Sequence, residues 1–262
     1  ANLAYQTEKN GTGRQVRVPK ACEAEALKII TTYLAENTPK NNRPDEPAWP
    51  ITRTFAGVWM GIILIVAHFS RLGGKAAHTI RNDYGASAER ILDGEWYRIT
   101  TALLLHADTL HLLGNVLGLG LFATAVCSTA GFGVGGLMIL GSGMMGNLAN
   151  ALLFETGHHS IGASTAVFGA VGIAAAHQFI VHWRQTGHRL KAWGALGGGL
   201  AILGMMGSSI NTDLTDHFFG FVAGFFIGLL FSSTRNEAPG QNAQIACLLL
   251  AVAILWASIV IP

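Results

Sequence analysis

The chain has 262 residues; 50% of them are hydrophobic, only 12% are charged, and the formal net charge is +2. Ordinary soluble domains carry about 25% charged residues, so this composition excludes that class and predicts an integral membrane protein. The net charge is small and the basic residues form no tract, so nucleic acid is not an expected partner.

Residues 1–53 form the first predicted segment, which is polar and contains five of the seven prolines. One amphipathic stretch within it, CEAEALKIITTYLAE, places Leu27, Ile30 and Leu34 at helical spacing. We expect a small extramembrane N-terminal segment, and no catalytic motif is visible in it.

Seven apolar runs follow, each close to the ~20 residues that a helix needs to cross the ~30 Å hydrocarbon core of a bilayer. They lie at about 54–70, 109–129, 132–154, 164–183, 192–209, 216–232 and 244–261. The sequence therefore predicts an all-α, polytopic membrane protein that is embedded in the lipid bilayer.

The charges of the connections predict the orientation of these spans. The connection RQTGHRLK, between the fourth and fifth runs, is basic, whereas SSINTDLTD, after the fifth run, carries only acidic charges. Cytoplasmic loops are enriched in Lys and Arg, so the basic connection is assigned to the cytoplasmic side. The membrane is expected to be the cell (inner) membrane. Alternation then places the N-terminus in the cytoplasm and the loops 71–108, 155–163 and 208–216 outside. The first of these loops opposes the rule with five basic residues, although five acidic residues balance them.

Polar groups stand at the outer ends of three spans in this topology. The second span carries His111 and Asn115 four residues apart, on one face of a helix. The fourth span opens with the tripeptide that ends at Ser164, and the sixth opens with His217. Polar and ionisable groups within spans are costly, so their shared depth predicts a functional site there.

These residue types suit acyl transfer. A serine hydroxyl becomes a nucleophile when a base removes its proton, and histidine is the usual base, so Ser164 and His217 form a candidate dyad. The oxyanion that develops needs donors, which Asn115, His111 and the backbone amide of Ser164 can supply. The chemistry requires no cofactor and no metal.

Glycines and one aromatic residue support this arrangement. Gly162 gives the backbone beside Ser164 conformational freedom. Glycine at every fourth position of GFVAGFFIG leaves a bare stripe on the sixth span, which brings His217 close to a neighbouring helix. Phe168 lies one turn below Ser164, where we expect it to pack against the imidazole.

Each feature alone has a common structural explanation. A serine at a helix start usually caps the helix, a histidine at a membrane interface is usually solvated or hydrogen-bonded, and GxxxG usually marks helix packing. Their matching order and depth favour catalysis.

As a set, the motifs resemble those of the rhomboid intramembrane serine proteases. The pattern of that family is matched by YR at 97–98, HLLGN at 111–115, GASTAVFG at 162–169 and HFFGFVAG at 217–224. The resemblance implies a six-helix rhomboid-like protease core at 54–232, followed by a linker and one additional C-terminal transmembrane helix at 233–262.

The resemblance also implies roles for individual residues and a class of substrate. The substrates of the protein would be single-pass membrane proteins, which are cut in or beside their transmembrane helix near the outer membrane face. The implied site comprises Ser164 as nucleophile, His217 as base, His111, Asn115 and the Ser164 amide around the oxyanion, and Gly162, Ala163 and Phe168 in support.

Two departures from the family pattern leave questions open. The inner end of the second span has no acidic residue, so an ionic partner for Arg98 is absent or lies elsewhere. Adjacent helical residues diverge by about 100°, so Asp216 is not expected to hold the neighbouring His217 ring. Asp213 could do so only if the helix extends that far, and a dyad is therefore the expected arrangement.

Three functions are compatible with these features. The main hypothesis is a protease whose site water reaches through a polar pocket formed by His106, His111 and Asn115. A catalytically inactive relative that binds transmembrane helices is the alternative. A transporter or metal-handling protein would use the histidines of GHH at 157–159, but these lack a second ligand pair nearby, and neither internal repeats nor a CxxC pair is found.

Overall fold

The computed structural model describes residues 6–10, 13–37, 51–71, 77–184, 189–207, 213–234 and 239–260. The chain divides into two units, Ala1–Ala48 and Trp49–Pro262. The domain boundary expected between residues 53 and 54 stays a prediction.

The described residues of the first unit form a hairpin, a 3-10 turn and an α-helix. Strands β1 (Gln6–Asn10) and β2 (Gly13–Arg17) pair antiparallel, with Gln6 opposite Arg17. They are followed by η1 (Lys20–Cys22) and α1 (Glu23–Asn37), which is the amphipathic stretch predicted from the sequence. Its apolar side chains Leu27, Ile30 and Leu34 are exposed.

Among the described residues of the second unit, five helical segments are long and apolar enough to cross a membrane. The first combines α6 (Thr109–Gly118), the π-helical turn η3 (Leu119–Ala123) and α7 (Thr124–Ala130). The others are α8 (Phe132–Phe154), α9 (Ser164–Arg184), α11 (Leu214–Thr234) and α12 (Gln241–Val260). The chain is therefore an all-α, multi-pass membrane protein.

Two further helices correspond to the first and fifth predicted spans. α2 (Ala56–Arg71) is apolar but has only 16 residues, and α10 (Arg189–Gly207) is not among the five segments that satisfy the length and hydropathy requirement. The count of six core spans plus one stays a prediction.

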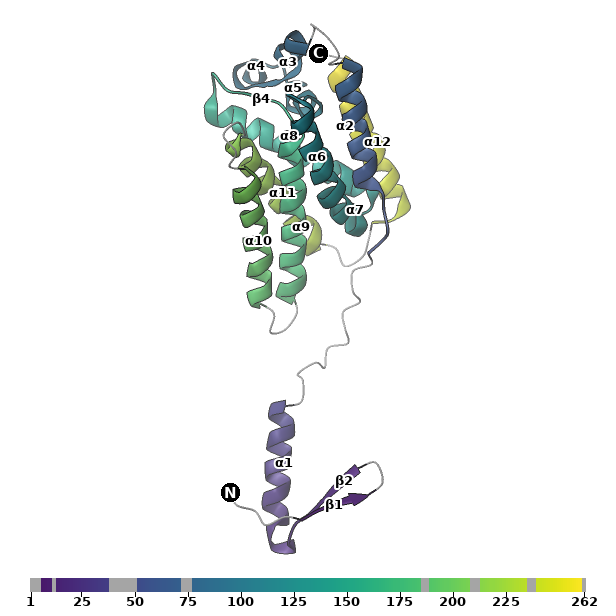
Figure 1. The fold of residues 1–262 in the computed structure, drawn as a ribbon, viewed down its shortest axis with the longest axis vertical. Coiled ribbons are helices and arrows are strands. Elements are labelled where there is room, and N and C mark those ends of the chain that lie inside the picture. Colours follow the sequence, from purple (N-terminus) through teal and green to yellow (C-terminus); the bar gives the residue numbers. More distant parts are fainter. Residues whose placement is uncertain are drawn as a thin grey trace. The chain divides into compact units, whose positions relative to one another are not determined.

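Helix α9 lies at the centre of this unit. In the most apolar stretch of α9, 67% of the residues are buried within the protein, compared with 6% of the residues in α12. Helices α8, α10 and α11 all pack against it, as Figure 1 shows. The buried positions of α9, from Thr165 to His177, are mostly apolar or small, as expected of a helix that its neighbours surround.

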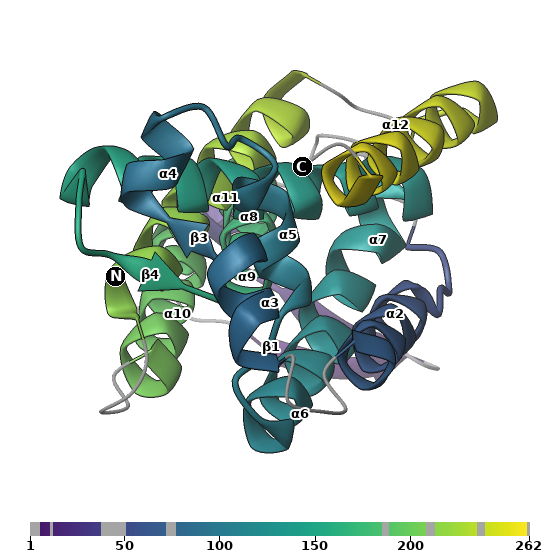
Figure 2. The ribbon, with the colours of Figure 1, turned by 90° about the horizontal axis from the view of Figure 1, so that it is seen from above.

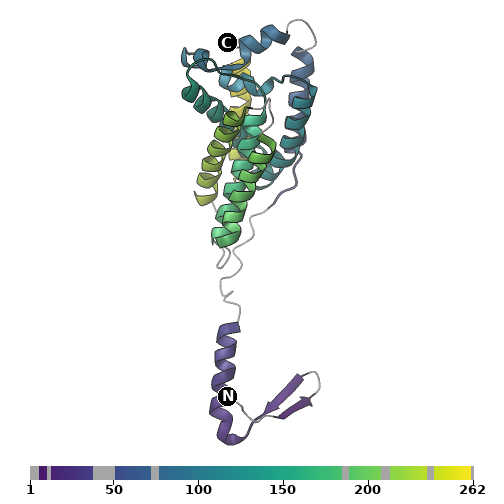
Figure 3. The same cartoon turned by 60° about the vertical axis from the view of Figure 1, so that its left-hand side comes forward.

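The segment 77–104 is predicted as part of a long outer loop, and the structure shows it to be folded. It forms α3 (Ala77–Tyr84), the short strand β3 (Ala86–Ser87), α4 (Ala88–Leu92), α5 (Arg98–Thr101) and η2 (Ala102–Leu104). Together these elements lie over one end of the helical bundle (Figures 2 and 3).

Arg98 lies in the interior of this segment, where its side chain is only 1% exposed. Its hydrogen bonds connect several parts of the segment. Its Nε donates to Glu95 at 2.5 Å, and one terminal nitrogen donates to the carbonyl oxygens of Asn82 and Gly85 at 2.8 and 2.9 Å. The hydrogen bond from Arg98 lowers the pKa of Glu95. The ionic partner missing from the second span is therefore Glu95, three residues before Arg98.

Helix α12 packs against α8, and one of its glutamines hydrogen-bonds to the turn between α7 and α8. Gln244 Oε1 accepts hydrogen bonds from the amides of Gly133 and Val134, at 2.9 and 3.0 Å, and its Nε2 donates to the carbonyl of Ala130 at 2.7 Å. The first amides of α8 have no partners within their own helix, so Gln244 caps α8 from a neighbouring helix.

We expect Gln244→Ala to destabilise the protein by about 1–3 kcal/mol, because it leaves two donors and one acceptor of the α7–α8 turn unpaired. Thermal unfolding of the purified protein in detergent measures this change. Gln241→Ala, an exposed position in the first turn of the same helix, is the control and should leave the melting temperature unchanged. Equal melting temperatures for the two variants would contradict this role of Gln244.

Candidate active site

Ser164 is the first residue of α9 and is half-buried. The loop before it is attached to the 77–104 segment. The strand β4 (His159–Ser160) pairs antiparallel with β3. In addition, the amide of Ala88 donates to the carbonyl of His158 at 3.0 Å, and the amide of Gly162 donates to the carbonyl of Ala102 at 2.9 Å. These backbone bonds hold the start of α9 in place.

Gly162 adopts a conformation that favours glycine, with φ at 129°. A Cβ at this position would lie 2.7 Å from Cε1 and Nε2 of His111, and 3.5 Å from the hydroxyl oxygen of Ser164. The imidazole of His111 and the Ser164 hydroxyl therefore both border the same glycine. The predicted requirement for glycine here has both a backbone and a steric reason.

Helix α6 presents its polar face to the start of α9. Asp108 caps α6 by accepting a hydrogen bond from the amide of His111 at 2.8 Å. Further along, a Cβ on Gly118 would lie 2.6 Å from Val167, so these two positions face each other. One turn earlier on both helices, Asn115 is at the level of Ser164. Asn115 is 5% exposed, and its Nδ2 has no hydrogen-bond partner in the described part of the chain.

His106, which is predicted to line a polar pocket with His111 and Asn115, lies beside His111. Its ring is fully buried and meets the ring of His111 edge-on, with centroids 5.2 Å apart. Burial lowers the pKa of His106 to about 3, so the imidazole is neutral. Its Nε2 accepts a long hydrogen bond, 3.5 Å, from the amide of Ala163.

Helix α11 contacts α9 through glycines. A Cβ on Gly220 would overlap the backbone of Thr165, one on Gly224 would overlap the backbone of Gly169, and one on Gly228 would lie 2.8 Å from the backbone of Ile173. The matched steps of four residues show that the two helices run parallel and in register.

This register places His217 at the same end of the bundle as Ser164. The His217 side chain is 4% exposed, and its ring packs on that of Phe168 with centroids 4.5 Å apart and an interplanar angle of 32°. Phe168 lies one turn after Ser164, so its ring is in contact with the imidazole as predicted. No hydrogen bond joins Ser164 to His217 within the described residues, and the buried Nδ1 of His217 has no partner there.

The two aspartates near His217 are engaged elsewhere. Asp213 caps α11, accepting from the hydroxyl of Thr215 at 2.6 Å and from the amide of Asp216 at 3.2 Å. The side chain of Asp216 accepts a hydrogen bond from Nδ2 of Asn150 on α8. Neither carboxylate contacts the His217 ring in the described structure.

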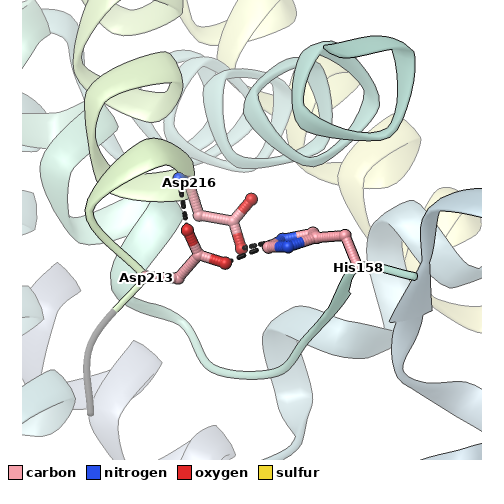
Figure 4. A group of neighbouring side chains, drawn as sticks. All are labelled: His158, Asp213 and Asp216. Atoms are coloured by element: carbon pink, nitrogen blue, oxygen red, sulfur yellow. Dashed lines mark hydrogen bonds and ion pairs between the residues drawn. The ribbon is translucent and has the colours of Figure 1, made fainter. Parts of the chain in front are cut away.

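Both aspartates instead face His158, as Figure 4 shows. Nε2 of His158 lies 2.7 Å from Oδ2 of Asp213 and 4.0 Å from Oδ2 of Asp216. Hydrogen bonding to Asp213 and then to Asp216 raises the pKa of His158 to about 9. Burial favours the neutral form of Asp213, but hydrogen bonds from His158 and Thr215 outweigh it and lower its pKa to about 2.

The prediction that His158 and His159 lack further ligands nearby is therefore wrong for His158. Its partners are more than fifty residues away in the sequence, and only the folded bundle brings them together. The acidic residues at the start of α11 are the one sequence signal that could have indicated them.

Comparison with known proteins gives consistent matches. The Rhomboid domain family matches residues 93–234. YdcA of Bacillus subtilis is 32% identical over 143 residues, which cover 53% of this chain and 69% of that protein. The rhomboid protease GluP of Bacillus subtilis is 26% identical over 208 residues, covering 77% of this chain and 39% of GluP. RHOMBOID-like protein 5 of Arabidopsis thaliana is 31% identical over 159 residues, covering 60% of this chain and 51% of that protein.

We expect Gly224→Ala to destabilise the protein by about 1–3 kcal/mol or more, because the added methyl group would overlap the backbone of Gly169 and force α9 and α11 apart. Gly198→Ala, in α10 with no atom within 4 Å of the added group, is the matched control and should be neutral or slightly stabilising. Thermal unfolding in detergent compares the two. A Gly224→Ala protein as stable as the control would show that these helices are not held at this distance.

Proposed function

The chain belongs to the rhomboid family, and we propose that it is a serine endopeptidase that cleaves single-pass transmembrane proteins near the outer membrane face. Rhomboid proteins act on transmembrane substrates within a lipid bilayer, and GluP, one of the relatives, is named a rhomboid protease. The chain spans less than two thirds of GluP and of the Arabidopsis relative, so the activity is proposed from its own residues.

The observation that carries the proposal is the position of His217 on Phe168, one turn from Ser164. In this arrangement His217 accepts the proton of the Ser164 hydroxyl, and the hydroxyl oxygen attacks the substrate carbonyl. The Phe168 ring restricts the imidazole to the face of α9. The missing hydrogen bond between the two side chains does not oppose this role, because catalytic hydrogen bonds are often long until substrate binds.

The oxyanion of the tetrahedral intermediate would be stabilised from the side of α6. His111 borders Gly162, and the amide of Ser164 is at the start of a helix, where the helix dipole favours negative charge. Asn115 offers a buried Nδ2 without a partner. An unpaired buried donor costs about 1–3 kcal/mol. A donor that is used only in the transition state accounts for keeping one here.

A dyad is the favoured form of this site. A triad acid must hold the base by a hydrogen bond to its second ring nitrogen, whereas Nδ1 of His217 has no partner in the described residues. Asp213 and Asp216 make their hydrogen bonds to Thr215, Asn150 and His158.

We infer the membrane orientation from the charges of α9, which begins at Ser164 and ends at Arg184. The basic end of α9 favours the cytoplasm, so the opposite end, with Ser164, faces outside, and the N-terminus is cytoplasmic. Substrate helices must open locally at the cleaved bond, because helical carbonyls are hydrogen-bonded along their own chain.

A catalytically inactive protein that binds transmembrane helices is the second candidate. The absence of a hydrogen bond between Ser164 and His217 in the described structure is compatible with this candidate as well as with the protease. In an inactive protein the two side chains would serve only to pack helices.

We expect Ser164→Ala and His217→Ala each to remove nearly all cleavage of a reconstituted transmembrane substrate. The two residues act on one proton, so the double variant should be no less active than either single variant. His159→Ala, an exposed histidine of the neighbouring loop, is the control and should cleave normally. Measurable activity in both single variants, with a much larger loss in the double variant, would refute the dyad.

A further inference from the structure

A cluster of polar side chains lies next to the proposed catalytic site but takes no part in it. His158 comes from the loop before α9, Asp213 and Asp216 come from the start of α11, and Asn150 comes from α8. One ligand atom each from His158, Asp213 and Asp216 lies within 4.8 Å of the others. Figure 4 shows the imidazole and the two carboxylates converging on one point.

The hydrogen bonds of His158 cannot all be satisfied at once. Its Nε2 lies 2.7 Å from Oδ2 of Asp213, an acceptor, and 2.5 Å from Nδ2 of Asn150, a donor. One ring nitrogen either donates or accepts. A protonated Nε2 therefore satisfies Asp213 and opposes the N–H of Asn150, and an unprotonated Nε2 does the reverse. A cation bound between Nε2 and the carboxylates would remove this conflict if the carboxamide oxygen of Asn150, and not its N–H, faced the cluster.

Asn150 supplies a second indication, a buried polar atom that lacks a partner in the described part of the chain. Its side chain is 1% exposed, its Nδ2 contacts both His158 and Asp216, and its Oδ1 is buried without a partner in the described residues. A rotation of the carboxamide by about 180° exchanges Oδ1 and Nδ2. Which of the two atoms occupies each position is assigned from the hydrogen bonds around them. After this rotation, Oδ1 would face the cluster and could serve as a fourth metal ligand.

We propose that His158, Asp213, Asp216 and Asn150 form a binding site for a divalent transition metal, with Zn²⁺ the expected ion. One imidazole nitrogen with carboxylate oxygens is a donor set that suits zinc, whereas Mg²⁺ and Ca²⁺ prefer oxygen ligands alone. Two carboxylates balance the charge of the ion. This site lies outside the proposed chemistry and does not depend on it.

A metal bound here would join the loop before Ser164 to the helix that carries His217. Asp213 and Asp216 belong to the start of α11, and His158 precedes the strand β4. Bound metal would therefore fix two segments that meet at the proposed active site, and it should raise the temperature at which the folded protein unfolds.

The test uses the purified full chain in detergent, stripped with a chelator and then titrated with ZnCl₂ against a chromogenic zinc indicator. We expect about one equivalent of Zn²⁺ per chain, a rise in melting temperature with added zinc, and no competition from excess Mg²⁺ or Ca²⁺. Ser164→Ala should bind zinc equally well, so this result is separate from any result on proteolysis.

His158→Ala removes a ligand, and Asp213→Ala removes a ligand and a negative charge, so each should weaken zinc binding by about 10- to 100-fold or more. Asp213→Asn, which removes the charge alone, should change zinc binding in the same direction. His159→Ala should bind as the parent does. His68→Gln tests the other group of histidines, in which the rings of His68, His106 and His111 lie near one another. The proposal fails if the parent binds no zinc, if folded His158→Ala and Asp213→Asn bind it unchanged, or if only His68→Gln loses it.

Discussion

The close contact between α9 and α11 is the constraint on which the proposed site depends. Lipid supplies no hydrophobic drive for helices to associate, so their contact rests on packing, and small residues allow the backbones to approach. Gly220, Gly224 and Gly228 meet the backbone of α9 at every turn. Because the two helices are parallel and in register, this contact alone sets the height of His217 relative to Ser164. Ser164 and His217 lie at the ends of two helices whose relative position is set by packing.

The second support of the site is the folded segment 77–104, which holds the loop before Ser164 from outside the bundle. Its own interior depends on Arg98, a buried charge that is tolerated because its donors meet a carboxylate and two backbone carbonyls. From there, two backbone hydrogen bonds and the β3–β4 pair reach the loop. Gly162 then allows the chain to turn into α9 without striking His111. The proposed catalysis thus needs both the packed helix pair and the folded segment that covers it.

Much of this arrangement could be predicted from the sequence because it depends on local patterns. The apolar runs gave α8 and α9 almost to the residue, and the spacing of glycines indicated the contact of α11. Motif order and depth grouped Ser164, His217, His111 and Asn115 at one end. The ion pair of Arg98 with Glu95, the cap that Gln244 makes on α8 and the group around His158 could not be predicted. Each depends on side-chain direction or on segments far apart in the chain, which periodicity does not encode.

The central claim is that the packing of α9 and α11 turns Ser164 into a nucleophile activated by His217. Labelling of the folded, detergent-purified protein with a fluorophosphonate, followed by mass spectrometric location of the adduct, tests it most directly. If His217 activates Ser164, we expect one adduct, on Ser164, and its loss in His217→Ala although the serine remains. Absence of any adduct on the folded parent protein, or labelling of Ser164 at an unchanged rate in His217→Ala, would contradict it.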